Sequence, residues 1–384
     1  MDRATITAGA DPVVVKVGTR VLTNQQGVLD EDRITGLAAQ LVSVADAGRR
    51  VALVSSGSVG AGIGRLGLRE RPAGLAELQA AAAVGQSRLI ELYNRSLEAR
   101  GRHAAQILLT ADDLNSRDRY LNIRNTLHEL FRLGAVPIVN ENDTVRVDEL
   151  QQNVGDNDRL AALVTNLIPA RLLILLTDIE GLYDGNPAAA GSKVIPLVKQ
   201  IDQSVLDLAE AKDETAIKLS TGGMASKLHA ALTATTAGGA VVVADGRAPD
   251  IVPRILAGEA VGTLFLPQGE RLSERKRWIG WGVRPAGTLR LDAGAARAIE
   301  SGGSSLLPVG VVGADGSFAK GDVVSLVGPD GEEIARGLSN YARSEVEQIR
   351  GRSTVEIAGI LGRRPYAELV HRDNLALVNA ATAR

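Results

Sequence analysis

The chain has 384 residues, more than one hydrophobic core usually accommodates, so two domains are expected. Its 45% hydrophobic and 23% charged residues exclude a disordered chain, and the formal net charge of −2 does not favour a nucleic-acid coat or a polybasic membrane anchor. The absence of cysteine excludes disulfides, thiolate metal sites and a cysteine nucleophile. No signal segment or membrane-spanning apolar run is visible, so we expect a soluble cytoplasmic protein.

The first predicted strand, Val13–Val17, is apolar except for Lys16 and ends at Gly18-Thr19. An apolar run of this length predicts a strand that is buried on both faces. A lysine in such a strand needs a compensating anion, which favours a ligand-binding role. A lysine that reaches into solvent from an edge strand would give the same pattern.

A predicted helix over Asp30–Ala47 and a second buried strand, Val51–Val54, lead into a loop of small residues, Ser55–Gly62. Open α/β sheets bind substrates in such loops, beyond the carboxyl ends of their strands. The alternation of strands and helices continues and predicts a mostly parallel open sheet with helices on both faces. The next helix, strand, helix and strand are expected at Leu75–Ala99, Ala104–Leu109, Arg119–Leu133 and Val136–Val139.

Two clusters of carboxylates and carboxamides follow, at Asn140–Asp143 and Val154–Asp158, and the second opens a predicted helix, Arg159–Leu167. Acidic groups hold an ammonium and amides hold a carboxylate, so the clusters suit a zwitterionic ligand. An Asx-rich turn, with Asp156 or Asp158 as a helix N-cap, would explain either cluster alone.

The most apolar strand, Leu172–Leu176, ends at Thr177-Asp178 and precedes a turn through Gly181–Pro187. Further along the chain, the strand Ala240–Ala244 and the run Gly262–Leu266 are expected to complete the sheet.

The segment Ser220–Lys227 reads S-T-G-G-M-A-S-K and leads into a predicted helix, Ala225–Ala237. Adjacent glycines let the backbone approach a ligand, and the start of a helix attracts anions, so the segment predicts a phosphate site. Lys227 would add charge at a terminal phosphoryl group. Only 8 of the 43 basic residues are lysines. A lysine in a glycine-rich segment is therefore less expected to be an ordinary surface charge, which favours a functional role for Lys227. The alternative is a tight turn that caps a surface helix.

The polar segment Pro267–Lys276 marks the expected domain boundary, with a first domain over residues 1–268, a linker over 269–284 and a second domain over 285–384. Short strands and turns beyond it predict a small β-rich, barrel-like domain. Its strands are expected at Thr288–Leu291, Gly310–Val312, Asp322–Val327 and Val370-His371, and its hairpin turns at Asp315-Gly316 and Asp330-Gly331.

Six motifs, in this order, resemble those of the amino-acid kinase family. They are V-V-V-K-V-G-T at Val13–Thr19, S-S-G-S-V-G-A-G at Ser55–Gly62, N-E-N-D at Asn140–Asp143, V-G-D-N-D at Val154–Asp158, L-L-T-D at Leu175–Asp178 and T-G-G-M-A-S-K at Thr221–Lys227. The tail resembles a PUA domain at Asp292–Ala295 and Gly303–Pro308. The resemblance implies the amino-acid kinase fold and ATP-dependent phosphorylation of the γ-carboxylate of L-glutamate, which gives L-glutamyl 5-phosphate for proline biosynthesis.

The resemblance also implies roles for individual residues. Lys16 and Lys227 would contact the transferring phosphoryl group, and Asp158 would position both lysines. Glutamate would be held by Ser56, Asp143 and Asn157, with Asn140 nearby. ATP would be bound by Lys16, Thr177 and Asp178 and by the backbone of Thr221, Gly222, Gly223, Met224, Ala225, Ser226 and Lys227. The chain departs from the family pattern at Arg20, at Ala225-Ser226 and at Gly185-Asn186, and the last of these concerns the nucleoside contacts.

The chemistry of the residues leads to the same class of reaction. A carboxylate substrate is ionised near neutral pH and needs no general base, but it is repelled by a triphosphate. Two lysines from separate loops would offset this repulsion, together with Mg²⁺ bound through the nucleotide phosphates and not by protein ligands.

Two alternatives stay open. Another small-carboxylate kinase of the same fold would use the same phosphate site. An RNA-binding protein acting through the tail is the second, although 11 basic and 12 acidic residues over 285–384 make RNA an unfavourable partner. The resemblance further implies feedback inhibition by proline, a homo-oligomer, and a glutamyl phosphate reductase that receives the product.

Overall fold

The computed structural model describes residues 2–24, 28–145, 157–187, 189, 191–210, 223–268, 273–362 and 366–378. The chain divides into two compact units. The first contains Met1–Leu114 and Asp118–Pro267, and the second contains Asn115–Arg117 and Gln268–Arg384.

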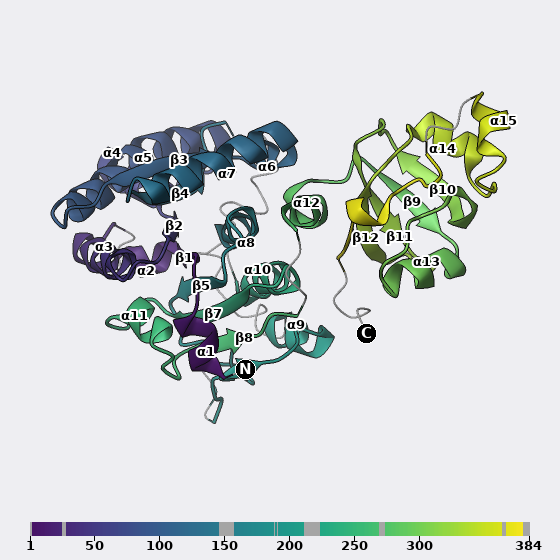
Figure 1. Ribbon diagram of the computed structural model, residues 1–384. Helices are drawn as coiled ribbons and strands as arrows, with labels where there is room; N and C mark the ends of the chain where they lie inside the picture. Colours follow the sequence, from purple (N-terminus) through teal and green to yellow (C-terminus); the bar gives the residue numbers. More distant parts are fainter. Residues whose placement is uncertain are drawn as a thin grey trace. The chain divides into compact units, whose positions relative to one another are not determined.

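The first unit is built on an eight-stranded sheet in the order β3-β4-β2-β1-β5-β7-β8-β6 (Figure 1). Neighbouring strands are parallel except β7 and β8, which run antiparallel. The mostly parallel sheet predicted from the sequence is therefore confirmed. The strands are β1 (Val13–Val17), β2 (Val51–Ser55), β3 (Ala104–Leu109), β4 (Val136–Glu141), β5 (Leu172–Thr177), β6 (Leu197–Val198), β7 (Ala240–Asp245) and β8 (Thr263–Phe265).

Helices cover both faces of this sheet. Figure 1 shows α8 and α10 on one side of the central strands and α3 and α11 on the other. The helices of the unit are α1 (Arg3–Ala8), α2 (Thr19–Leu22), α3 (Glu31–Asp46), α4 (Ser58–Leu66), α5 (Leu75–Glu98), α6 (Ala111–Asn115), α7 (Arg117–Arg132), α8 (Asn157–Leu167), α9 (Gln203–Glu210), α10 (Met224–Thr236) and α11 (Ile251–Leu256).

The alternation of side chains along β1 decides where its lysine lies. Val13, Val15 and Val17 join the apolar core that the sheet forms with α3, α5 and α11. Successive residues of a strand point to opposite faces, so Lys16 faces the other side, where it meets α8. β1 is a central strand between β2 and β5, and the edge-strand alternative for Lys16 is therefore wrong.

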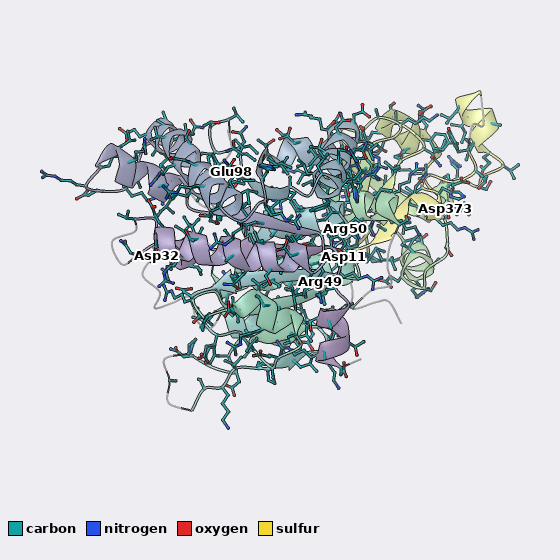
Figure 2. All side chains as sticks on the ribbon, turned by 60° about the vertical axis from the view of Figure 1, so that its left-hand side comes forward. Asp11, Asp32, Arg49, Arg50, Glu98 and Asp373 are labelled. Carbon is teal, nitrogen blue, oxygen red and sulfur yellow. The ribbon has the colours of Figure 1, made fainter. Side chains whose placement is uncertain are left out.

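An exposed ion pair holds the starts of β1 and β2 together. Arg50 Nη2 lies 2.8 Å from Asp11 Oδ2, and the Arg50 backbone N–H donates to Asp11 Oδ1 at 2.8 Å (both labelled in Figure 2). Partial burial raises the pKa of the Asp11 carboxyl, but the hydrogen bonds and charge of Arg50 outweigh it and hold the pKa below its usual value.

The small-residue segment after β2 differs from its prediction. It was expected to be a loop over Ser55–Gly62, but α4 begins at Ser58. The glycines serve helix packing instead. A Cβ at Gly62 would lie 1.7 Å from the Ala81 carbonyl oxygen of α5, and a Cβ at Gly85 would lie 1.8 Å from the Ser58 carbonyl oxygen of α4. Only glycine permits so close an approach of two helix backbones.

The second unit contains a mostly antiparallel five-stranded sheet in the order β10-β9-β11-β12-β13, in which only β9 and β11 pair in parallel. Its strands are β9 (Gly287–Leu291), β10 (Val311–Gly316), β11 (Val323–Val327), β12 (Glu333–Leu338) and β13 (Leu375–Leu377). Its helices are α12 (Glu274–Arg277), the π-helix η1 (Trp278–Gly282), α13 (Ala293–Glu300), the 3₁₀ helices η2 (Pro308–Gly310) and η3 (Arg372–Asn374), α14 (Arg343–Ile349) and α15 (Ile357–Leu361).

Two expected features of this unit are wrong, and one is confirmed. Asp330-Gly331 does connect the antiparallel strands β11 and β12. Asp315-Gly316 lies in β10, paired with Thr288 and Gly287, because neighbouring strand residues supply its backbone partners. Val370 forms an isolated bridge with Leu306 and no regular strand. Within the described ranges, no helix combines the length and apolarity needed to cross a membrane.

Candidate active site

Two lysines from separate parts of the first unit meet on one buried carboxylate. Lys16 Nζ lies 2.6 Å from Asp158 Oδ1, and Lys227 Nζ lies 3.2 Å from Asp158 Oδ2. The side chains of both lysines are 7% exposed and that of Asp158 is 1% exposed. Each carboxylate oxygen therefore faces one ammonium group.

Secondary structure explains this meeting. Lys16 points from the central strand β1 toward the face covered by α8. Asp158 lies in the first turn of α8, and Lys227 lies in the first turn of α10. Parallel strands present their carboxyl ends at one edge of the sheet, and the helices that follow them begin there, so residues far apart in sequence converge at this edge.

The electrostatics of the cluster favour its charged form. Burial by itself raises the pKa of the Asp158 carboxyl, but the two lysine charges and hydrogen bonds outweigh that effect and lower it below its ordinary value. Two ammonium groups and one carboxylate leave a formal charge of +1 in a nearly buried site. Positive charge held in a nearly buried site favours a nearby anion, so the cluster is suited to an anionic ligand.

The described part of the predicted phosphate segment lies at the start of α10. Gly223 precedes the helix as its N-cap, and Met224, Ala225 and Ser226 form its first turn with Lys227. Ser226 Oγ donates to Asp158 Oδ2 at 3.2 Å, a contact that the sequence did not predict. Thr221 and Gly222, with Ser220 before them, lie outside the described residues, as do residues 146–156, which include most of the second polar cluster.

The predicted substrate residues form a connected network beside the lysines. Asn157 Nδ2 donates to Ser56 Oγ at 2.8 Å, to the Ser55 carbonyl at 3.2 Å and to Asn140 Oδ1 at 3.1 Å. Ser56, Asn140 and Asn157 are all buried. Asn157 Oδ1 is also buried and has no hydrogen-bond partner within the described part of the chain. It is an acceptor available to a ligand.

Asp143 lies at a cavity of about 370 Å³ beside this network. Ser58 Oγ, in the first turn of α4, donates to Asp143 Oδ2 at 2.8 Å. The prediction did not include Ser58, although the residue is part of the S-S-G-S motif. The cavity combines apolar walls with amides and carboxylates, including Gln86, Asn142 and Asp143. This composition suits a small polar ligand.

Thr177 is the last residue of β5, one residue beyond the predicted strand, and Asp178 follows it; both are close to the segment after β1. Arg20 Nη1 donates to Asp178 Oδ2 at 3.1 Å, and Thr177 Oγ1 donates to Asp178 Oδ1 at 3.2 Å. Burial raises the pKa of the Asp178 carboxyl, but its bonds, first among them that from Arg20, bring the pKa below its usual value. Arg20 therefore fixes a predicted nucleotide residue.

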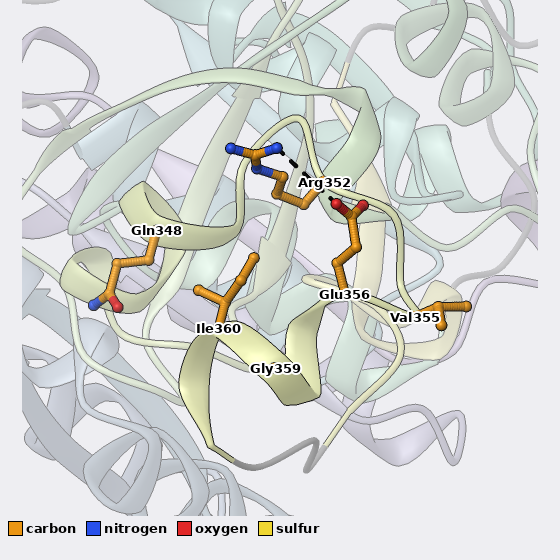
Figure 3. A pocket seen from close by; sticks show the side chains of 6 residues that line it. All are labelled: Gln348, Arg352, Val355, Glu356, Gly359 and Ile360. Atoms are coloured by element: carbon orange, nitrogen blue, oxygen red, sulfur yellow. Dashed lines mark ion pairs between the residues drawn. The ribbon is translucent and has the colours of Figure 1, made fainter.

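No three His, Asp or Glu side chains of the described ranges gather as a candidate metal site. Both oxygens of Asp158 already face lysines, so its donor set does not suit a protein-bound cation. A second hollow, of about 630 Å³, lies in the second unit (Figure 3). It contains an ion pair of 4.0 Å between Arg352 and Glu356 but none of the predicted site residues.

Comparison with known proteins gives matches along nearly the whole chain. The model of the amino acid kinase family matches residues 11–245, and the model of the PUA domain matches residues 287–361. The chain is 50% identical to a glutamate 5-kinase of Rhodopirellula baltica over 95% of this chain and 93% of that protein. It is 49% identical to a glutamate 5-kinase of Moorella thermoacetica (95% and 96% covered) and 51% identical to one of Gloeobacter violaceus (96% and 99% covered).

Proposed function

The chain belongs to the amino acid kinase family, and we infer that it phosphorylates the γ-carboxylate of L-glutamate with ATP. The product is L-glutamyl 5-phosphate, the first intermediate of proline biosynthesis. The observation that supports this function best is the pair of buried ammonium groups on Asp158, beside a pocket of amides and carboxylates.

The cluster of lysines is suited to the transferred phosphoryl group. In the reaction, a γ-carboxylate oxygen of glutamate bonds to the terminal phosphorus of ATP while the bond from that phosphorus to the bridging oxygen of ADP breaks. No proton moves, because the attacking carboxylate is already ionised. Lys16 and Lys227 would stabilise the negative charge on the moving group, and Asp158 would hold both in place.

The main barrier to the reaction is repulsion between the glutamate carboxylate and the triphosphate of ATP, and the positive charges of this site reduce it. The cluster has a formal charge of +1 before any ligand binds, and its geometry is fixed by the sheet and two helices. Charges that are already oriented need no reorganisation in the transition state. Magnesium, bound through the nucleotide phosphates, would supply further positive charge.

The two ends of glutamate fit the polar network next to the cluster. Asp143 and Asn157 Oδ1, which has no hydrogen-bond partner among the described residues, are acceptors for the α-ammonium group. Ser56 lies between Asn157 and the end of β2, where it would contact the substrate close to the lysines. Thr177, Asp178 and the start of α10 would bind the nucleotide.

The proposal is tested by trapping the acyl phosphate with hydroxylamine after incubation with ATP, Mg²⁺ and one acceptor at a time. We expect hydroxamate from L-glutamate and little from L-aspartate or N-acetyl-L-glutamate. The N-acetyl compound lacks the ammonium that Asp143 would bind. Preference for either of the other acceptors would instead indicate another carboxylate kinase of the same fold.

The role of Asp143 is tested by Asp143→Ala. Loss of a carboxylate that binds the ammonium should raise the KM for glutamate about 10- to 100-fold, with a smaller effect on the KM for ATP. An unchanged KM for glutamate would remove Asp143 from the substrate site.

A further inference from the structure

Two backbone groups fix the orientation of the buried amides next to the lysine cluster. The backbone N–H of Glu141 donates to Asn140 Oδ1 at 2.9 Å, so the amide oxygen of Asn140 must be on that side. Asn157 Nδ2 donates to the Ser55 carbonyl at 3.2 Å, so its nitrogen must be there. A backbone N–H cannot accept and a carbonyl cannot donate, which leaves one arrangement for both side chains.

This arrangement determines how Gln86 of α5 is oriented. Asn140 Nδ2 lies 2.7 Å from Gln86 and is a donor, so Gln86 must present its oxygen, Oε1. The amide nitrogen of Gln86 then points away from Asn140. Gln86 Nε2 is buried and, within the described part of the chain, has no hydrogen-bond partner. A buried donor without a partner costs stability unless a ligand accepts from it.

Gln86 also lines the cavity of about 370 Å³ that Asp143 borders. The network runs from Asn157, next to Asp158, through Asn140 to Gln86. Among the described residues, its first end offers an acceptor without a partner, Asn157 Oδ1, and its far end offers a donor without a partner, Gln86 Nε2. The acceptor is complementary to an ammonium and the donor to a carboxylate.

The fold holds Gln86 firmly at this place. Gly85, the preceding residue, packs so tightly on α4 that a Cβ would lie 1.8 Å from the Ser58 carbonyl and 2.3 Å from the Gly62 nitrogen. The same turn of α4 carries the Ser58 hydroxyl that binds Asp143. Gln86 and Asp143 are thus positioned by one helix contact.

We propose that Gln86 binds substrate directly, with Nε2 donating to the α-carboxylate of the amino-acid acceptor. The γ-carboxylate must lie at the lysines, and Gln86 is at the end of the network away from them, so the α-carboxylate is the group it meets. This inference rests on the proposed function. It adds a specificity-determining residue that selects acceptors with a free carboxylate beside the ammonium.

The test compares L-glutamate with its α-amide, L-isoglutamine, in the hydroxylamine assay with the full chain. Gln86→Glu retains an oxygen for Asn140 and replaces the donor nitrogen by an anionic oxygen. It should raise the KM for glutamate at least about 10-fold, since a charge-assisted hydrogen bond is exchanged for repulsion. The KM for ATP should stay within about 3-fold, because Asn140 and Asn157 lie between Gln86 and the lysine cluster. The amide of isoglutamine can donate to the new carboxylate, so the KM for isoglutamine should rise much less.

The decisive quantity is the ratio of kcat/KM for glutamate to kcat/KM for isoglutamine. We expect Gln86→Glu to lower this ratio at least about 10-fold. Gln106→Glu is the matched control, because Gln106 lines the same cavity from β3 and is exposed. If Gln86→Glu changes the ratio no more than Gln106→Glu does, the proposal is overturned.

A second variant covers the case in which Gln86→Glu does not fold, as judged by thermal unfolding. Gln86→Met removes the donor at similar volume and should also lower the ratio; a ratio equal to that of the wild type would contradict the proposal. The two proposals fail in different ways. Wild-type protein that forms no hydroxamate from glutamate contradicts the proposed function, whereas an active wild type with an unaltered ratio in both variants contradicts only the role of Gln86.

Discussion

The interiors of the two units are built differently. In the first, three charged side chains, those of Lys16, Asp158 and Lys227, meet in the interior, and each is at most 7% exposed. In the second, a core of apolar residues lies beneath ion pairs such as Arg290–Asp315, whose side chains are 57% and 56% exposed. Buried charges are costly and exposed pairs are nearly neutral, so the cluster lowers the stability of the first unit more than a surface pair lowers that of the second, as the proposed binding site requires.

The contrast predicts that equal chemical changes have unequal effects in the two settings. Removal of the Asp158 charge from the buried cluster takes away the carboxylate that both lysines face. Removal of one charge from a surface pair leaves its partner in water.

The largest effect is expected from Asp158→Asn. Two nearly buried lysines would lose the carboxylate that both face, so the free energy of unfolding should fall by about 3–5 kcal/mol, and turnover should be lost as well. Asp11→Asn, at the exposed pair with Arg50, is the control and should cost about 1 kcal/mol or less. Urea unfolding of both variants measures the difference, and similar losses would contradict the contrast.

The pH dependence of this difference follows from the lowered pKa of Asp158. A carboxyl whose pKa is lower in the folded than in the unfolded state stabilises the fold above its unfolded pKa, near 3.8. The stabilisation is lost as the pH falls through the folded pKa. The gap between wild type and Asp158→Asn should therefore be constant from about pH 5 to pH 8 and shrink only in acid.

The next effect is expected from Lys227→Ala. Its ammonium should bind most strongly when charge spreads over the transferring phosphoryl group, so kcat should fall about 100- to 1,000-fold while the KM for glutamate changes little. Lys193→Ala removes an exposed lysine of the same unit and should leave kcat unaltered. Normal turnover with a raised KM for ATP would assign Lys227 to ground-state binding only.

A smaller effect separates packing from charge within the first unit. Gly85→Ala places a methyl group against the Ser58 carbonyl and should cost about 1–3 kcal/mol and raise the KM for glutamate, because α4 carries Ser58. Gly64→Ala, in the facing helix α4, meets only Val28 methyl groups at 3.8 Å and should be neutral or stabilising by up to about 1 kcal/mol. Thermal unfolding and glutamate titration distinguish the two.

The smallest effect is expected in the second unit. Arg352→Ala breaks the 4.0 Å pair with Glu356, whose two side chains are about half exposed, and should alter the free energy of unfolding by no more than about 0.5 kcal/mol. The kinetic constants for glutamate and ATP should stay the same, because the candidate site uses residues of the first unit. A change in kcat would show that this surface influences the reaction.

The amino-acid sequence by itself determined most strands and helices of the sheet in the first unit, and it predicted the candidate site residues. The apolar runs around Lys16 and before Thr177 gave the buried strands because hydrophobic periodicity is a local property. The glycines before Lys227 predicted the start of α10, because the preference of glycine for turns and helix ends is also a local property. The same kind of local signal failed at Asp315-Gly316, a dipeptide typical of turns, since pairing with β9 satisfies its backbone.

Only the tertiary structure decided which of these groups meet. The strand order that puts β1 next to β5, and the two helices over one face, direct Lys16 and Lys227 to the two oxygens of Asp158. Gln86 is the clearest case. It lies in the long helix α5 with no motif around it, and it joins the network through Asn140, a residue of strand β4. Such contacts depend on distances in space, and local preferences along the chain do not encode which distant segments the packed core brings together.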